Sequence, residues 1–214
     1  QGCIVAVKGI GGYHLACCAK KPQTVKELRL RKGREAKPFA VMCAGIEEAR
    51  RLCRISKAEE ELLTSVSRPI VLLEKQDFCD VAEEVAPDNK DLGVMLPYAP
   101  VHELLLKDGD VWVMTSGNPS EDPIYYQEEA ALKCLAPMAD YFLIHNREIC
   151  RPVDDSVMGV FDGKPYMIRR SRGFAPLPVP LPEGFPSLLA VGGQLKNTFC
   201  LTRGHQAFLS HHIG

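Results

Sequence analysis

The chain has 214 residues, of which 46% are hydrophobic and 25% charged, with a formal net charge of −1. This length favours one full domain with a piece of a second, and the composition excludes a disordered chain. A net charge near zero gives no chain-wide attraction for nucleic acid or membranes, so any anion site must be a local patch. The apolar runs are too short to span a bilayer, and no signal-peptide pattern opens the chain.

Helix and strand patterns alternate through the first two thirds of the chain. Thr24 with Glu27 has the spacing of a capping box before a basic helix that ends at Gly33, and Ser56 with Glu59 predicts a second such start. The predicted strands are 3–7, 38–43, 69–73, 92–96, 111–114 and 141–144. The predicted helices are 13–19, 25–32, 46–54, one that begins at Ser56, 100–106 and 127–135.

The pattern changes to hairpins after residue 155. Asp162-Gly163 joins strands 156–161 and 166–170 in a predicted tight turn. The whole predicts an α/β or α+β fold, a mixed sheet with flanking helices, over residues 1–174. The proline-rich stretch 175–187 predicts an interdomain linker. Residues 188–214 carry a second hairpin pattern, 198–201 and 206–210, but are too few to bury a core, so they predict the N-terminal fragment of a second domain.

The cysteines and histidines predict no metal site. The nine cysteines are scattered without a Cys-x-x-Cys pair, which disfavours zinc, and their odd number indicates reduced thiols in a cytoplasmic protein. His211 and His212 are adjacent and would face opposite sides of a strand, so they cannot easily share a metal. Both ends of the sequence adjoin strand patterns directly, so we expect a piece of a longer chain.

A basic stretch at the end of the first long helix is the first candidate site. A polyphosphate needs several fixed cations, and arginine can grip a phosphate with two parallel hydrogen bonds. Gly33 would end the helix and let the residues after it turn toward the same anion. A solvated basic helix face explains the charges equally well. The five basic residues are Arg29, Arg31, Lys32, Arg34 and Lys37.

Three further segments can carry chemistry. Residues 115–120 follow a strand and offer three hydroxyls and an amide to phosphate or ribose, although an ordinary polar turn is the stronger reading of that segment alone. The turn Lys8-Gly9-Ile10-Gly11-Gly12 is better explained by tight-turn geometry than by anion binding. Asp154 and Asp155 could hold magnesium, with the arginines of 169–172 on phosphate, or these acidic and basic groups could pair with one another.

In this order, the segments resemble the YrdC-like domain of the HypF family, the carbamoyltransferases that mature [NiFe]-hydrogenases. The resemblance is carried by KGIGGYHLACCA (8–19), LRLRKGREAKPFAVM (28–42), LGVMLPYAPVHELLL (92–106), VMTSGNPSEDPI (113–124), DYFLIHNREI (140–149), DDSVM (154–158) and IRRSRGFAP (168–176). LAVGGQLKNTFCL and FLSHHIG resemble the opening of the family's following ASKHA-type domain. The resemblance implies a twisted sheet around a positively lined cavity.

The resemblance also implies a reaction. Carbamate, obtained from carbamoyl phosphate, attacks the α-phosphate of ATP and gives carbamoyl-adenylate and pyrophosphate, with ATP and Mg²⁺ as the implied cofactors. In the full-length family members the carbamoyl group then passes to a C-terminal cysteine of the partner protein HypE.

The resemblance assigns roles to nine residues. Catalysis falls to Lys32, Arg34 and Lys8. The nucleotide would be bound by Lys32, Arg34 and Lys37 of a K-x-R-type motif, by Ser116 and Asn118 of an S-x-N-type loop, and by Ser156 and Arg170. The acyl substrate would be bound by Lys8 and Tyr13.

Other readings of the sequence remain open. A threonylcarbamoyl-AMP synthase for tRNA modification shares the K-x-R and S-x-N motifs, but the Lys8 turn and the segments MLPYAPVH and KNTFCL argue against it. An RNA-binding module would use the basic stretch, but the near-zero net charge and the lack of interleaved aromatic residues disfavour it. A structural fragment with a degenerate pocket is the remaining alternative.

Overall fold

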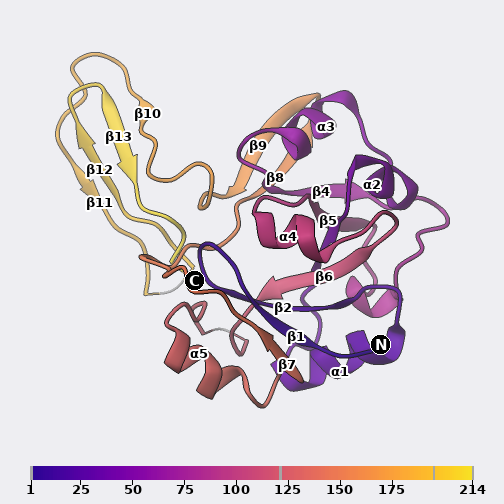
Figure 1. Cartoon of the computed structure of the whole chain (residues 1–214). Coiled ribbons are helices and arrows are strands. Elements are labelled where there is room, and N and C mark those ends of the chain that lie inside the picture. The colour runs from indigo at the N-terminus through magenta and orange to yellow at the C-terminus, as the bar shows by residue number, and fades with distance from the viewer. Residues whose placement is uncertain (1, 121, 195, 214) are drawn as a thin grey trace.

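The computed structural model describes residues 2–120, 122–194 and 196–213. Within these residues the strands form a nine-stranded mixed sheet and a four-stranded antiparallel sheet, which stands apart from the larger one (Figure 1). The predicted fold class, a mixed sheet with flanking helices, is confirmed. No helix in the described part of the chain is both long and apolar enough to cross a membrane.

The large sheet is built from strands that are far apart in the sequence, with both parallel and antiparallel neighbours. In spatial order they are β7 (Tyr141–Leu143), β1 (Val5–Lys8), β2 (Tyr13–Cys18), β6 (Val111–Ser116), β3 (Ala40–Cys43), β5 (Asp91–Met95), β4 (Ile70–Glu74), β8 (Val157–Phe161) and β9 (Lys164–Arg169). The helices are α1 (Pro22–Lys32), α2 (Ile46–Leu52), α3 (Lys57–Thr64), α4 (Pro100–Leu105), α5 (Glu128–Leu135) and the 3-10 turn η1 (Glu83–Val85).

The sheet buries apolar side chains on both faces. Successive residues of a strand point to opposite faces, so Leu15 of β2 lies in the larger core while Ala16 lies in a second, smaller one. Residues of α4 pack against the smaller core, and residues of α1, α2 and α3 contribute to the larger. Burial on both faces explains why the central strands are continuous apolar runs.

The predicted helix at 13–19 is wrong, because this segment is strand β2. Its alanine and leucine residues favour a helix locally, but β2 lies between β1 and β6 and pairs with both. Five of its six residues are buried, and two-sided burial within a sheet overrides the local preference.

The two predicted capping boxes have different outcomes. Ser56 and Glu59 form theirs at the start of α3, where each side chain bonds to the backbone of the other residue. The one predicted for Thr24 and Glu27 is wrong, since α1 begins earlier, with Pro22 in its first turn and Lys21 as N-cap. Proline is preorganised for that position, so the helix starts there without a side-chain cap.

The small sheet contains part of the proline-rich stretch. Its strands are ordered β10 (Val179–Pro180), β13 (Gln206–Leu209), β12 (Cys200–Arg203) and β11 (Leu189–Ala190). The stretch expected as a linker therefore supplies an edge strand, a position where the missing N–H of proline does no harm.

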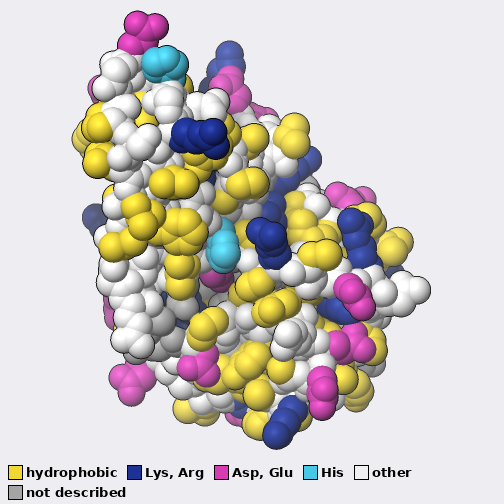
Figure 2. Space-filling model, turned by 90° about the vertical axis from the view of Figure 1, so that its left-hand side faces the viewer, with side chains coloured by type: hydrophobic (Ala, Val, Ile, Leu, Met, Phe, Trp, Pro, Cys, Tyr) yellow, Lys and Arg dark blue, Asp and Glu magenta, His cyan; other side chains and the backbone are white. Residues whose placement is uncertain are grey.

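Apolar side chains of the second module, residues 179–213, remain exposed. They include Leu189, Val191, Phe199, Leu201 and Phe208. Figure 2, which looks at the side of the molecule that carries the small sheet, shows hydrophobic side chains across this face. A piece of this size cannot bury them by itself.

A buried ionic cluster joins the segment that follows β9 to strand β2. The Arg172 guanidinium donates from Nε to Asp155 at 2.8 Å and from Nη1 and Nη2 to the carbonyls of Ser67 and Arg68 at 3.0 and 2.8 Å. The other Asp155 oxygen lies 3.0 Å from Nε2 of His14 in β2. Burial alone would raise the pKa of Asp155, but His14 and Arg172 outweigh it and hold the pKa well below its usual range.

Removing the Asp155 carboxylate leaves two buried basic groups without their partner. We expect Asp155→Ala to lower the free energy of unfolding at pH 7 by about 3–5 kcal/mol, measured by urea denaturation. Because the folded pKa is depressed, this contribution is present above the unfolded pKa of about 3.9 and is lost as the pH falls through the folded value. The difference between wild type and variant should therefore shrink in acid. The exposed Asp108→Ala is the control, and an equal loss in both variants would contradict the role of the cluster.

Candidate functional site

The end of α1 is shaped by Gly33, which adopts the left-handed conformation (φ 63°). Its N–H bonds to the carbonyls of Arg29 and Leu30, and the Arg34 N–H bonds to the Arg29 carbonyl at 3.0 Å. Glycine takes this conformation without strain, so the helix closes in a compact cap. The chain thereby reverses direction just before the last two basic residues of the stretch.

Arg29 organises the loop that follows this cap, a role that sequence reasoning missed. It is buried, and its guanidinium donates to the carbonyls of Glu84, Arg34 and Glu35 at 2.5, 3.0 and 3.1 Å. It also lies 4.8 Å from the centre of the Phe39 ring. The signal in the sequence was its spacing from Val25 and Lys32, which places all three on one helix face.

Lys32 joins the two predicted phosphate motifs. Its side chain is buried, and the ammonium donates to the carbonyls of Ser116 and Asn118, both at 2.5 Å, and to Oδ1 of Asn118 at 2.7 Å. Burial, with the nearby charges of Arg34 and Lys37, lowers the pKa of Lys32 to about 7. The structure thus brings the basic stretch and the hydroxyl-rich turn together at one place.

The turn after β6 is held tightly against β2. The Gly117 N–H donates to the Tyr13 carbonyl at 2.6 Å, and Ser116 Oγ donates to Asn118 Oδ1 at 2.7 Å. A Cβ at position 117 would lie 2.7 Å from the Tyr13 carbonyl oxygen, so the close approach of the two backbones requires glycine. Glycine here also lets Ser116 and Asn118 converge on the Lys32 ammonium.

Arg34 and Lys37 add positive charge beside Lys32. Arg34 donates to the carbonyls of Lys37 and Pro38 at 3.0 and 2.6 Å, which fixes the loop around it. Burial, followed by the charges of Arg29 and Arg169, lowers the pKa of Arg34 to about 10. The pKa of Lys37 is lowered by burial and by the same kind of cationic neighbours, with Asp154 as the opposing charge. Crowded cations of this kind favour a bound anion.

Ser156 and Arg170 use their hydrogen bonds within the fold. The fully buried Ser156 hydroxyl donates to the Arg172 carbonyl and accepts from the Ser171 N–H, both at 2.8 Å. Arg170 Nη2 donates to the carbonyls of Phe174 and Leu177 at 2.8 and 2.5 Å, while its Nη1 is buried without a hydrogen-bond partner among the described residues. Both residues therefore shape the backbone around 171–177.

Lys8 and Tyr13 make no hydrogen bond to the Lys32 ammonium among the described residues. They pair across β1 and β2, and the Lys8 ammonium bonds to Glu128 of α5 at 2.7 Å and to the His145 carbonyl at 2.9 Å. Tyr13 lies in the larger core with Val25 and Leu28 of α1, so its side chain is on the face of the sheet that α1 covers. The Tyr13 hydroxyl is buried without a partner in the described structure, and burial and Glu128 raise its pKa. Sequence reasoning missed Glu128.

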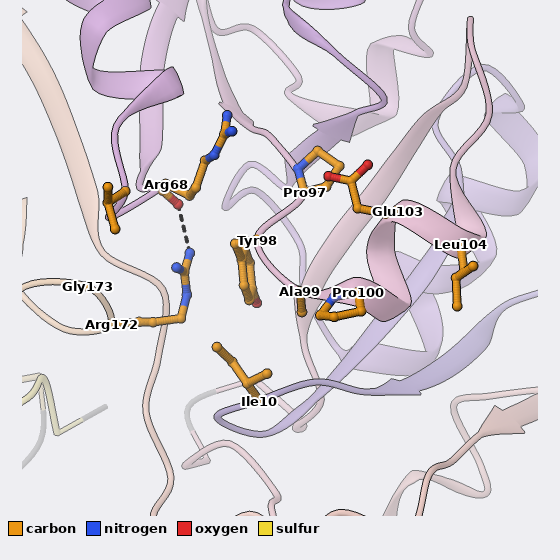
Figure 3. A pocket seen from close by; sticks show the side chains of 11 residues that line it. Ile10, Arg68, Pro97, Tyr98, Ala99, Pro100, Glu103, Leu104, Arg172 and Gly173 are labelled. Carbon is orange, nitrogen blue, oxygen red and sulfur yellow. Dashed lines mark hydrogen bonds between the residues drawn. The ribbon is translucent and has the colours of Figure 1, made fainter.

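A separate cavity of about 810 Å³ lies near the buried ionic cluster (Figure 3). Its lining includes Ile10, Arg68, Tyr98, Glu103 and Arg172, and it contains none of the nine predicted site residues. The Arg172 guanidinium lies 3.4 Å from the centre of the Tyr98 ring. The sequence left open whether the aspartates of 154–155 and the arginines of 169–172 bind a ligand or pair with one another. Of these residues, Asp155 and Arg172 pair with each other.

Gly117→Ala tests how the turn after β6 depends on glycine. The added methyl must push against backbone atoms of Tyr13, so we expect a loss of about 1–3 kcal/mol in the free energy of unfolding. Gly193→Ala is the control, because a Cβ at that position meets nothing within 4 Å. Thermal or chemical denaturation of both variants is the measurement, and equal stability of the two would show that the close approach is dispensable.

Comparisons with known proteins identify the family of the chain. Residues 1–171 match the Sua5_yciO_yrdC family model, described as "Telomere recombination", and residues 183–214 match the HypF Kae1-like domain. The chain therefore belongs to the Sua5/YciO/YrdC family, and its last residues match the HypF Kae1-like domain.

Within this family, the chain is similar along its whole length to carbamoyltransferase HypF. It is 47% identical to HypF of Rhizobium leguminosarum bv. viciae and 45% identical to that of a Synechocystis strain. The chain spans 29% and 28% of these two proteins. The resemblance to HypF seen in the sequence motifs is thus confirmed.

Solved structures show the same relation. A crystal structure of full-length HypF in a phosphate- and nucleotide-bound form covers all of this chain with 52% identity and a TM-score of 0.94, and the match spans 34% of that protein. A Sua5 from P. abyssi complexed with L-threonine has a TM-score of 0.69 at 20% identity, covers 79% of this chain and spans 51% of that protein. The likeness to Sua5 shows a shared fold alone.

Proposed function

We propose that this chain binds ATP and activates carbamate as carbamoyl-adenylate, within a HypF-type carbamoyltransferase. The observation that carries the proposal is the Lys32 ammonium, which is near the charges of Arg34 and Lys37 and bonds directly to Ser116 and Asn118. Whole-length similarity to HypF, one of whose structures is nucleotide-bound, supports the same reading.

The proposed step forms one bond and breaks one. A carbamate oxygen attacks the α-phosphorus of ATP, the bond from that phosphorus to the bridging oxygen breaks, and pyrophosphate leaves with the electron pair. Lys32, Arg34 and Lys37 would stabilise the charge that grows on the leaving group. One cation–phosphate contact at about 4 Å is worth only roughly 4 kcal/mol at an effective dielectric of 20, so several are needed.

The remaining predicted residues have supporting places in this proposal. Ser116 and Asn118 would bind the nucleotide, and Ser156 and Arg170 would hold the backbone that borders it. Asp154, the carboxylate close to Lys32 and Lys37, is the group suited to share Mg²⁺ with the phosphates. Lys8, whose ammonium is paired with Glu128, and Tyr13 would bind the carbamate.

The other steps of a HypF-type reaction would take place in a full-length HypF-type protein. We propose that carbamoyl phosphate supplies the carbamate and that the carbamoyl group ends on a C-terminal cysteine of a HypE-type partner. All nine cysteines are free thiols in the described residues, which suits a cytoplasmic protein.

The proposed chemistry is tested by pyrophosphate release from ATP and Mg²⁺. We expect release to depend on added carbamate and to be indifferent to threonine. Release that requires threonine and bicarbonate would instead support a threonylcarbamoyl-AMP synthase. Lys32→Met, which removes the ammonium, should abolish the carbamate-dependent release.

Arg34→Ala tests the nucleotide site directly. We expect the affinity for MgATP to fall roughly 10- to 100-fold, the scale of one or two hydrogen bonds to a charged group, as measured by titration calorimetry. The control is Arg51→Ala on α2, whose side chain is 72% exposed. Unchanged affinity in Arg34→Ala, in a variant that keeps the wild-type melting temperature, would remove Arg34 from the site.

The pKa of Lys32 makes the affinity for ATP depend on pH. A bound phosphate favours the charged, ammonium form of Lys32. In the protein without ATP, burial and then the charges of Arg34 and Lys37 lower the pKa of Lys32 to about 7. Affinity should therefore fall as the pH rises from 7.5 to 9, by up to about tenfold per unit. Lys32→Arg keeps its charge over this range and should flatten the profile. An equally steep profile in both proteins would exclude Lys32 as the titrating group.

A further inference from the structure

The second module turns back onto the end of the large sheet. After β13 the chain returns to the junction of the two sheets, where the C-terminus lies (Figure 1). There the His212 N–H donates to the Arg170 carbonyl at 3.1 Å. Asn197 and Ile213 exchange two backbone hydrogen bonds of 3.1 and 2.8 Å, so residues 197 and 211–213 are held together beside β9.

This return places a histidine among the charges of the candidate site. Burial lowers the pKa of His212, and the next largest contribution comes from Arg169, with Lys37 and His211 acting in the same direction and Asp154 opposing them. The charge of Lys196, in the second module, contributes to the lowered pKa of Lys37. The cations around Lys37 therefore come from both modules.

The His212 side chain has no structural hydrogen bond that would explain its position. Its backbone N–H binds the Arg170 carbonyl, but its ring makes no hydrogen bond or ion pair with any residue that the structure describes. The ring is half-buried and thus still reachable. A half-buried ring beside Arg169 and Lys37 is placed to donate to an anion that these cations attract.

We propose that His212 completes the polyphosphate site, so that the ATP site is built from two modules. The imidazole would donate to a β- or γ-phosphate oxygen of the ATP held by Lys32, Arg34 and Lys37. This inference rests on the proposed function, and it adds a phosphate-binding residue that lies outside the YrdC-like part of the chain.

The test compares ATP with AMP on the whole chain. His212→Ala should weaken MgATP about tenfold, the scale of one hydrogen bond to a charged group, and leave AMP nearly unchanged, because AMP has no β- or γ-phosphate. His212→Lys supplies another hydrogen-bond donor at this position and should recover most of the ATP affinity. His205→Ala, in the exposed turn between β12 and β13, is the matched control and should bind both nucleotides like wild type.

Each outcome decides between a phosphate contact and a packing role. Equal ATP affinity in wild type and His212→Ala would overturn the inference and leave the proposed function standing. A matched loss of ATP and AMP that His212→Lys does not rescue would also overturn it, because it would show a purely structural role. A wild-type chain that binds no ATP would refute the proposed function itself, and the inference with it.

Discussion

The structure of the candidate site depends on a buried ammonium group. Lys32 lies at the end of a helix, yet its charge is held inside by three oxygen atoms of a turn 84 and 86 residues further along the chain. A buried charge is tolerated only when it is well hydrogen-bonded, so the position of the helix and the position of the turn are fixed together. The same bonds leave a cation poised beside Arg34, where a phosphate can compete for it.

Backbone geometry, more than side-chain chemistry, makes this possible. Gly33 reverses the chain after the helix, and Gly117 lets the turn after β6 approach Tyr13 closely. The Arg29 guanidinium donates hydrogen bonds to the carbonyls of Arg34 and Glu35 in the loop after the helix. In the sequence, Arg29 is a candidate for binding a ligand. In the structure its charge instead holds the loop that carries Arg34 and Lys37.

Much of this could be predicted from local patterns. The hairpin at Asp162-Gly163, the capping box at Ser56 and most strand positions follow from turn chemistry and apolar periodicity. The helix predicted at 13–19 failed because only the neighbours β1 and β6 make that segment a strand. The motifs indicated Lys32, Ser116 and Asn118. The sequence could not show that Arg29 binds the Glu84 carbonyl or that Lys8 pairs with Glu128, because these partners lie far along the chain.

The two modules differ in how they bury their apolar residues. Both apolar cores consist of residues of the first module, which also holds the buried pair of Asp155 with Arg172. The second module leaves apolar residues exposed and touches the first near Arg170, beside the crowded cations. Asp154 already opposes the cations around Lys37, and a polyphosphate would neutralise more of their charge. A bound polyphosphate would therefore strengthen the junction between the modules as well as the site, which couples nucleotide binding to their relative position.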